Sequence, residues 1–179
     1  MNLTEHEKAN KIKAAIHDIP DFPQPGILFR DITPVLADKE LFHLAVSIFA
    51  ERYQKQKIDK IVAVEARGFI LGAALAYALN IGFIPVRKPG KLPRQTFQEA
   101  YNLEYGNNTL EIHADCFKPG QRVVIIDDVL ATGGTAAATA QLVQRVGGEV
   151  IEMGFLLELQ FLEGRNKLGT TPVFSAIKY

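Results

Sequence analysis

Apolar residues occur in two patterns along this chain: helical spacing, which is typical of amphipathic helices, and short continuous runs, which are typical of buried strands. Thr4 and Glu7 form a capping-box pattern, which predicts a helix that ends before Pro20. Asp38 is expected to cap a second helix, in which apolar residues recur with helical spacing. Further helices are predicted over 70–79 and 135–146, and short apolar runs predict strands over 60–64, 83–86, 123–126, 150–157 and 173–177.

Strands alternate with helices through the middle of the chain, an order that is typical of βαβ units with right-handed crossovers. We therefore expect an α/β fold with a mainly parallel, twisted sheet flanked by helices. Ligands of such folds bind beyond the carboxyl ends of the strands. The 179 residues carry no repeat or linker, so 1–179 is predicted to be a single domain.

Three segments do not follow the alternation. Residues 21–29 hold prolines and a glycine, which predicts a stiff loop, and 87–101 lack apolar periodicity, which is typical of a functional loop. Two short strands are expected within 104–112. The uncharged run 68–86 approaches the length of a membrane span, but a turn signal at 80–82 divides it into a helix and a strand.

Charge and composition exclude several classes of protein. Equal numbers of basic and acidic residues, 20 of each, argue against a nucleic-acid partner, because such affinity rests on neutralised phosphates. The one cysteine, Cys116, forms no intrachain disulfide and favours the cytoplasm. The four histidines lack zinc-helix spacing, and the two serines lie outside a nucleophile-elbow motif. The polar, acidic start is unlike a signal peptide, and we expect no membrane partner.

The strongest chemical signal follows the strand predicted over 123–126. Asp127 and Asp128 come directly after it, then a loop of small residues, then the start of a helix. Unpaired N–H groups at a helix N-terminus bind phosphate, and the glycines of the loop let backbone N–H groups approach an anion. Paired carboxylates beside a phosphate site suit the vicinal hydroxyls of a sugar, with a hard metal ion close by. The loop lacks the lysine of a Walker A motif.

The segment 123–135 is similar to the phosphoribosyl-diphosphate-binding motif of the type I phosphoribosyltransferases. Four more segments resemble the adenine-specific members of that family in order and spacing, at 22–32, 65–69, 87–93 and 101–106. The resemblance implies a type I phosphoribosyltransferase-like fold with a flexible catalytic loop and a small base-binding hood, to which about 1–35 contribute. It also implies a purine-salvage reaction in which adenine and phosphoribosyl diphosphate, with Mg²⁺, give AMP and pyrophosphate.

The residues suit this chemistry. Asp127 and Asp128 would hold the ribose hydroxyls and favour the oxocarbenium-like charge that develops when the anomeric bond breaks. We expect Mg²⁺ to bind mainly through substrate and water, without a set of protein ligands. The 5′-phosphate is assigned to the loop of Ala131, Thr132, Gly133, Gly134 and Thr135. Pyrophosphate is assigned to Glu65, Ala66, Arg67, Arg87, Lys88 and Lys91.

In the family, the 65–67 turn contains a strained non-proline peptide that offers its N–H to pyrophosphate, and the 87–101 loop reaches the partner's active site. The resemblance therefore implies a homodimer. The base pocket is predicted from Leu28, Phe29, Arg30 and Leu159. Glu104 is predicted to be the acid or base for the purine nitrogen. Closure of the loop would exclude water from the activated sugar.

Alternatives remain open. Arg67 could form a surface ion pair, and the basic run 87–94 could be a solvated loop. Leu28 and Phe29 could be ordinary core residues. Glu104 could be a solvated strand residue. The base could be xanthine, guanine or hypoxanthine, or the protein could sense phosphoribosyl diphosphate as a regulator without transferring it.

Overall fold

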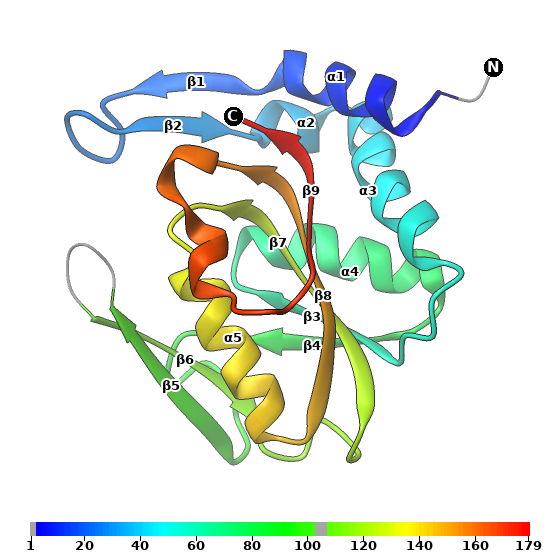
Figure 1. Ribbon diagram of the computed structural model, residues 1–179, viewed down its shortest axis with the longest axis vertical. Helices are drawn as coiled ribbons and strands as arrows, with labels where there is room; N and C mark the ends of the chain where they lie inside the picture. Colours follow the sequence, from blue (N-terminus) through cyan, green and yellow to red (C-terminus); the bar gives the residue numbers. More distant parts are fainter. Residues whose placement is uncertain (1–2, 103–106) are drawn as a thin grey trace.

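A five-stranded sheet lies at the centre of the computed structural model, which describes residues 3–102 and 107–179 (Figure 1). The strand order is β4-β3-β7-β8-β9, and every neighbouring pair is parallel. The strands are Lys60–Val64 (β3), Gly82–Val86 (β4), Gln121–Leu130 (β7), Gly148–Glu158 (β8) and Val173–Lys178 (β9). The prediction of an α/β fold with a mainly parallel sheet is confirmed.

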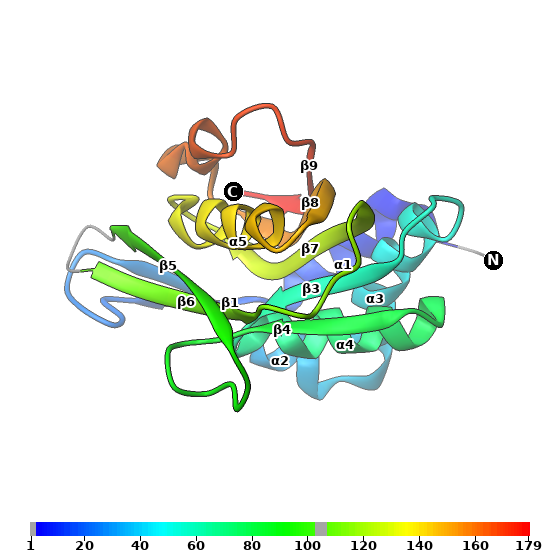
Figure 2. The ribbon, with the colours of Figure 1, turned by 90° about the horizontal axis from the view of Figure 1, so that it is seen from below.

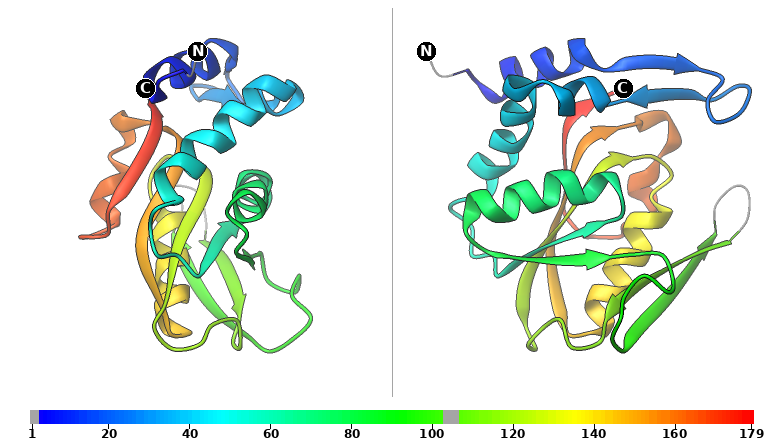
Figure 3. Two further views of the ribbon diagram at one scale, coloured as in Figure 1. Left: turned by 90° about the vertical axis from the view of Figure 1, so that its right-hand side faces the viewer. Right: turned by 180° about the vertical axis from the view of Figure 1, so that it is seen from behind.

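Helices cover both faces of this sheet. Figure 2 shows α5 (Gly134–Arg145) on one side, with α3 (Lys39–Tyr53) and α4 (Arg67–Leu79) on the other, and Figure 3 shows the same layers from two further sides. The side chains of β7 alternate between the two cores: Val124 and Ile126 pack with α3 and α4, whereas Val123 and Ile125 pack with α5. A strand that is buried on both faces needs a continuous apolar run, which is why this one was visible in the sequence.

The N-terminal helix is shorter than predicted. Helix α1 (Glu5–Ala15) begins at the expected capping box but ends at Ala15, and His17–Pro20 (β1) then pairs antiparallel with Leu28–Asp31 (β2). Pairing with β2 satisfies the backbone of β1, and Ile19 is 38% exposed, so it has no place on the apolar face of a helix. The loop predicted over 21–29 therefore ends where β2 begins.

A second antiparallel pair replaces part of the long loop predicted over 87–101. Thr96–Asn102 (β5) pairs with Asn107–His113 (β6), so only the first part of that segment is a loop. Of the two short strands predicted within 104–112, residues 104–106 lie outside the described residues, and 107–112 belong to one strand, β6, whose partner lies earlier in the chain. Packing of β5 and β6 against α5 in the second core decided this arrangement.

Other elements differ in extent. Strand β7 continues through Leu130, so the two aspartates lie inside the strand instead of after it. The short helix α2 (Thr33–Ala37) and the 3-10 turns η1 (Gln160–Leu162) and η2 (Gly164–Lys167) complete the described chain. Asp38 caps α3 as predicted, by accepting from the N–H groups of Glu40 and Leu41. Within 3–102 and 107–179, no helix has the length and apolar character to span a membrane.

Candidate active site

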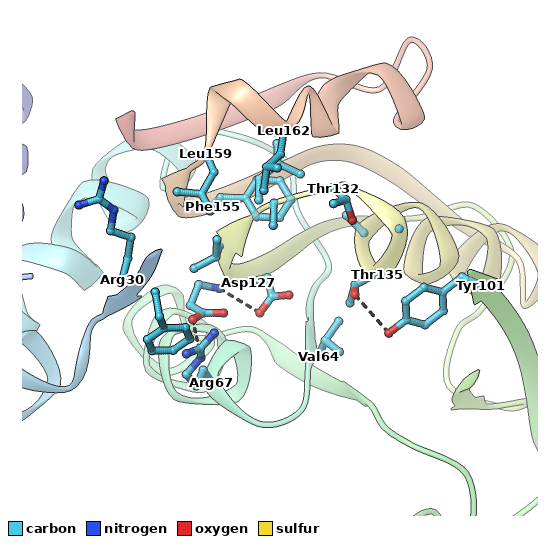
Figure 4. A pocket seen from close by; sticks show the side chains of 18 of the residues that line it. Arg30, Val64, Arg67, Tyr101, Asp127, Thr132, Thr135, Phe155, Leu159 and Leu162 are labelled. Carbon is cyan, nitrogen blue, oxygen red and sulfur yellow. Dashed lines mark hydrogen bonds and ion pairs between the residues drawn. The ribbon is translucent and has the colours of Figure 1, made fainter. Parts of the chain in front are cut away.

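A cavity of about 630 Å³ opens at the carboxyl ends of the central strands (Figure 4). The ends of β3 and β7 form its floor, the start of α5 forms one wall, and strand β2 lies at one end. Its lining includes most of the residues that the sequence predicts for the site: Leu28, Phe29, Arg30, Glu65, Ala66, Arg67, Lys88, Asp127, Asp128, Ala131, Thr132, Gly133, Gly134, Thr135 and Leu159.

The two aspartates at the end of β7 form a close pair. The Asp128 N–H donates to Oδ1 of Asp127 over 2.9 Å, and Asp128 is 5% exposed. Burial, and then repulsion from the Asp128 carboxylate, raise the pKa of Asp127 well above its ordinary value. Burial also raises the pKa of Asp128, against the opposing charge of Arg67. Two acids are therefore held where a positive or hydroxyl-bearing ligand would favour their ionised forms.

Arg67 is the cation nearest to this pair. Its Nε lies 2.6 Å from Oδ2 of Asp128, and its guanidinium carbon lies 5.0 Å from the centre of the Phe29 ring. Oδ2 is buried, and its contact with Arg67 among the described residues is an ion pair. The charge of this buried oxygen is thus balanced by Arg67, and Asp128 and Arg67 line the cavity together.

Gly68, at the start of α4, lets the helix approach the acid pair closely. A Cβ at Gly68 would lie 2.6 Å from Oδ1 of Asp127 and 3.1 Å from the Ile126 carbonyl oxygen. An ordinary side chain has no room there, so the glycine allows the start of α4, with Arg67, to pack directly against Asp127. This requirement was not recognised in the sequence, although Gly68 belongs to a segment that carries the family resemblance.

The loop before α5 has the features of a phosphate site. Gly133 has a positive φ of 79°, and no side chain of the described residues caps the helix that begins at Gly134. The first N–H groups of α5 therefore face the cavity, where the helix dipole favours an anion. The Thr135 hydroxyl donates to the Tyr101 hydroxyl over 3.2 Å, which joins the loop to β5.

The predicted pyrophosphate residues divide into two groups. Glu65, Ala66, Arg67 and Lys88 line the cavity, and the Glu65–Ala66 peptide bond is cis. Arg87 and Lys91 are not among its lining residues in the described part of the chain. Arg87 donates from Nε to Glu65 over 2.7 Å, and the Lys88 N–H donates to the same carboxylate over 2.9 Å. Glu65 therefore aligns the start of the basic loop, residues 87–94, while it also lines the cavity.

The other end of the cavity is apolar. Leu28 is 43% exposed, and the Phe29 ring packs edge-to-face on Phe22 with the centroids 5.1 Å apart. Arg30 points away from the acid pair (Figure 4): its guanidinium lies 4.0 Å from the Tyr179 ring centre and pairs with Asp18. The side chain of Arg30 thus connects the end of the cavity to Tyr179 and Asp18.

Several lining residues were not predicted. Some of them lie in segments that the sequence had singled out but were given no role: Ile27, Tyr101, Val129 and Leu130. The others come from strands, a helix and a turn that meet only in the folded chain: Val64, Leu110, Ala136, Phe155 and Leu162. Tyr101 could have been singled out as an aromatic residue between a basic run and an acid. Glu104, the predicted acid or base, lies outside the described residues.

Comparison with known proteins agrees with this geometry. Residues 33–166 match the family model described as "Phosphoribosyl transferase domain". The chain therefore belongs to the phosphoribosyltransferase family.

Within that family, the similar full-length proteins are adenine phosphoribosyltransferases. The protein from Syntrophotalea carbinolica is 60% identical over 168 residues, which cover 94% of this chain and 98% of that protein. The crystal structure from Thermoanaerobacter pseudethanolicus is 53% identical with a TM-score of 0.93, and the match covers 96% of this chain and 99% of that one. A Saccharomyces cerevisiae structure, complexed with an imino-altritol bisphosphate and adenine, is 43% identical with a TM-score of 0.90, covering 94% and 98%.

Proposed function

We propose that the protein is an adenine phosphoribosyltransferase, which transfers the 5-phosphoribosyl group of phosphoribosyl diphosphate to adenine and releases AMP and pyrophosphate. This is a reaction of purine salvage. The observation that carries the proposal is one cavity that holds a close acid pair, an uncapped helix N-terminus and an apolar end. The names of the similar proteins support the choice of adenine.

The acid pair is assigned to the ribose. Asp127 and Asp128 accept hydrogen bonds from the 2′- and 3′-hydroxyls, which favour the ionised carboxylates despite their burial. Negative charge at this point stabilises the oxocarbenium-like ribose while the bond to pyrophosphate breaks. The loop 131–135 holds the 5′-phosphate through backbone N–H groups and the hydroxyls of Thr132 and Thr135, so that the sugar cannot drift during the reaction.

The leaving pyrophosphate carries several negative charges, and cations must balance them. Arg67 and Lys88, which line the cavity, are assigned to this role, and so are Arg87 and Lys91 of the adjacent loop, which lie outside the lining. Mg²⁺, when bound, neutralises part of the charge on the diphosphate. We expect substrate oxygens and water to supply most of the ligands of such an ion.

Adenine is assigned to the apolar end of the cavity. Phe29 and Leu28 contact one face of the ring, Leu159 closes the pocket, and backbone groups of Leu28 and Arg30 recognise the edge of the base. We assign Glu104 as the carboxylate that takes the N9 proton when the purine nitrogen attacks the anomeric carbon. Closure of the 87–101 segment over the cavity would limit hydrolysis of the activated sugar.

We further propose that 1–179 form one domain and that two copies form a homodimer in which the basic loop of one subunit reaches the cavity of the other. The position of Lys91 outside the lining of its own cavity supports this arrangement. Mixing inactive Lys91→Ala and Asp127→Asn subunits tests it, because recovered activity requires a site built from two chains. A protein that remains monomeric, or mixtures that remain inactive, would refute it. We also place the protein in the cytoplasm, in keeping with a single, buried cysteine.

The central experiment is incubation of the purified protein with Mg²⁺, phosphoribosyl diphosphate and each purine in turn, with nucleotide measured by chromatography. We expect AMP from adenine and little nucleotide from hypoxanthine, guanine or xanthine. Nucleotide from another purine but not from adenine would refute the choice of base. Binding of phosphoribosyl diphosphate without any transfer, together with a shift of RNA or DNA in a gel, would indicate a regulator.

A further inference from the structure

An ion pair between the buried Glu158 and the partly exposed Arg165 lies at the end of β8, next to the cavity but outside its lining. Arg165 donates from Nε and Nη2 to the two oxygens of Glu158, over 2.6 and 2.7 Å. Glu158 is 4% exposed, and these hydrogen bonds lower its pKa. Arg165 also donates to the carbonyl of Val173 over 3.1 Å and to the Ser175 hydroxyl over 3.4 Å, so one guanidinium joins η2 to β8 and β9. Such a two-point contact fixes orientation as well as distance.

Gly164, the residue before Arg165, packs against the backbone of loop 131–135, called the phosphate loop from here on. Glu163 has a φ of 51°, and this turn brings the buried Gly164 against the loop. A Cβ at Gly164 would overlap the carbonyl oxygen of Ala131 and lie 3.0 Å from the nitrogen of Gly133. A Cβ at Gly133 would in turn overlap the carbonyl oxygen of Gly164. Backbone therefore packs on backbone here, and any shift of η2 moves the loop.

The segment from Leu159 to Lys167 also forms the wall of the cavity that lies opposite Arg67. The Leu159 N–H donates to the Leu130 carbonyl over 2.9 Å, and Leu159 and Leu162 line the cavity. Figure 4 shows both leucines beside Phe155, on the side opposite Arg67. The segment from Leu159 to Lys167 thus backs the phosphate loop at one end and walls the cavity at the other.

We propose that Arg165 is a positioning residue for the 5′-phosphate: held by Glu158, it keeps Gly164 against Ala131 and Gly133 and so maintains the phosphate loop in its binding shape. This inference rests on the proposed function, because it assigns the 5′-phosphate to that loop. Arg165 itself contacts no reacting atom. Its loss would leave Glu158 buried without its partner and allow η2 to move away from the loop.

The chain provides a matched control in a second pair of the same kind. Arg52 on α3 donates from Nε and Nη2 to Glu152 over 2.7 and 2.6 Å, and Glu152 is 7% exposed. Glu152 lies on β8 as Glu158 does, but its neighbour across the sheet is Val124, whereas Glu158 is beside Leu130. The control pair is therefore about 20 Å further from the cavity end of the sheet.

The test compares Arg165→Met with Arg52→Met. For each variant we would measure the unfolding temperature, the KM for phosphoribosyl diphosphate, and the calorimetric affinities for ribose 5-phosphate and for pyrophosphate with Mg²⁺. Both variants are expected to lose similar stability. Only Arg165→Met is expected to raise the ribose 5-phosphate Kd and the KM by about tenfold. Its pyrophosphate Kd, and every constant of Arg52→Met, are expected to stay within about twofold.

Conservative variants keep the test decisive. Arg165→Lys retains the charge but not the two-point contact, and we expect it to recover part of the lost affinity, with Arg52→Lys as its control. If Arg165→Met does not fold, the two lysine variants carry the comparison. Equal stability losses with unchanged ribose 5-phosphate affinity in the Arg165 variants would overturn the inference. So would a matching rise in the pyrophosphate Kd. Failure of the unaltered protein to make AMP from adenine would refute the proposed function alone, because ribose 5-phosphate binding still reports on the loop.

Discussion

Replacing Gly68 by alanine tests how finely Asp127 is placed. The new Cβ would lie 2.6 Å from Oδ1 of Asp127, where ordinary van der Waals contact begins at 3.4 Å. The two atoms must therefore separate by about 0.8 Å, and the carboxylate is the more movable partner because the Ile126 carbonyl, 3.1 Å from the same Cβ, belongs to the sheet. Displacing a reacting geometry by about 1 Å can cost about 100-fold in rate.

The effect of this substitution on stability is expected to be small. Alanine gains about 1 kcal/mol of helix propensity over glycine, and an extra methyl in a tight space costs about 1–3 kcal/mol, so the two effects largely offset each other. We therefore expect kcat/KM for phosphoribosyl diphosphate to fall about 100-fold, or about 2.7 kcal/mol, with a loss of stability below about 2 kcal/mol.

Gly72→Ala is the matched control, one turn further along α4. Its Cβ would lie 2.7 Å from the Cβ of Ala63 and 3.2 Å from a ring carbon of Phe83, so the steric conflict is similar but lies in the core. Steady-state kinetics and thermal unfolding of both variants decide the matter. If Gly68→Ala and Gly72→Ala lower kcat/KM equally, the acid pair is not the sensitive element and the reasoning is refuted.

Three other changes test the remaining assignments. Burial and the Asp128 charge raise the pKa of Asp127, so its ionisation destabilises the folded state as the pH rises above 3.8, the ordinary pKa of an aspartate. Asp127→Asn is therefore expected to gain unfolding temperature relative to the parent as the pH rises above that value, and calorimetry showing a relative loss would contradict this. Glu104→Gln is expected to leave substrate affinity largely intact and to lower turnover, and undiminished turnover would remove its assigned role. Lys88→Ala is expected to raise the calorimetric Kd for pyrophosphate with Mg²⁺ about tenfold while ribose 5-phosphate affinity stays constant, and equal losses for both would show a general disturbance of the cavity.

Local signals in the chain predicted most of the sheet and part of the site. The apolar run of β7 is continuous because both of its faces are buried, and the cap at Asp38 is a local hydrogen bond. The chemistry of the loop 131–135 is also local, since small residues directly precede a helix. Such features are encoded within a few neighbouring residues, and sequence patterns can identify them.

The antiparallel ribbons could not be predicted in this way. The end of α1 at Ala15 depends on the pairing of His17–Pro20 with Leu28–Asp31, and the extent of β5 depends on its pairing with β6 and on the packing of both against α5. Intrinsic helical or loop preference gave way to these non-local hydrogen bonds, as it commonly does for strands.

The sequence by itself determined the parallel α/β sheet, the family and the residue types of the candidate site, because these are local patterns and motifs. Tertiary structure alone decided which groups meet: Arg67 with Asp128, Gly68 with Asp127, and Arg165 with Glu158 behind the phosphate loop. Each of these contacts joins different elements of the fold. Their distances and burial follow from how the sheet aligns its strand ends, which no short stretch of sequence specifies.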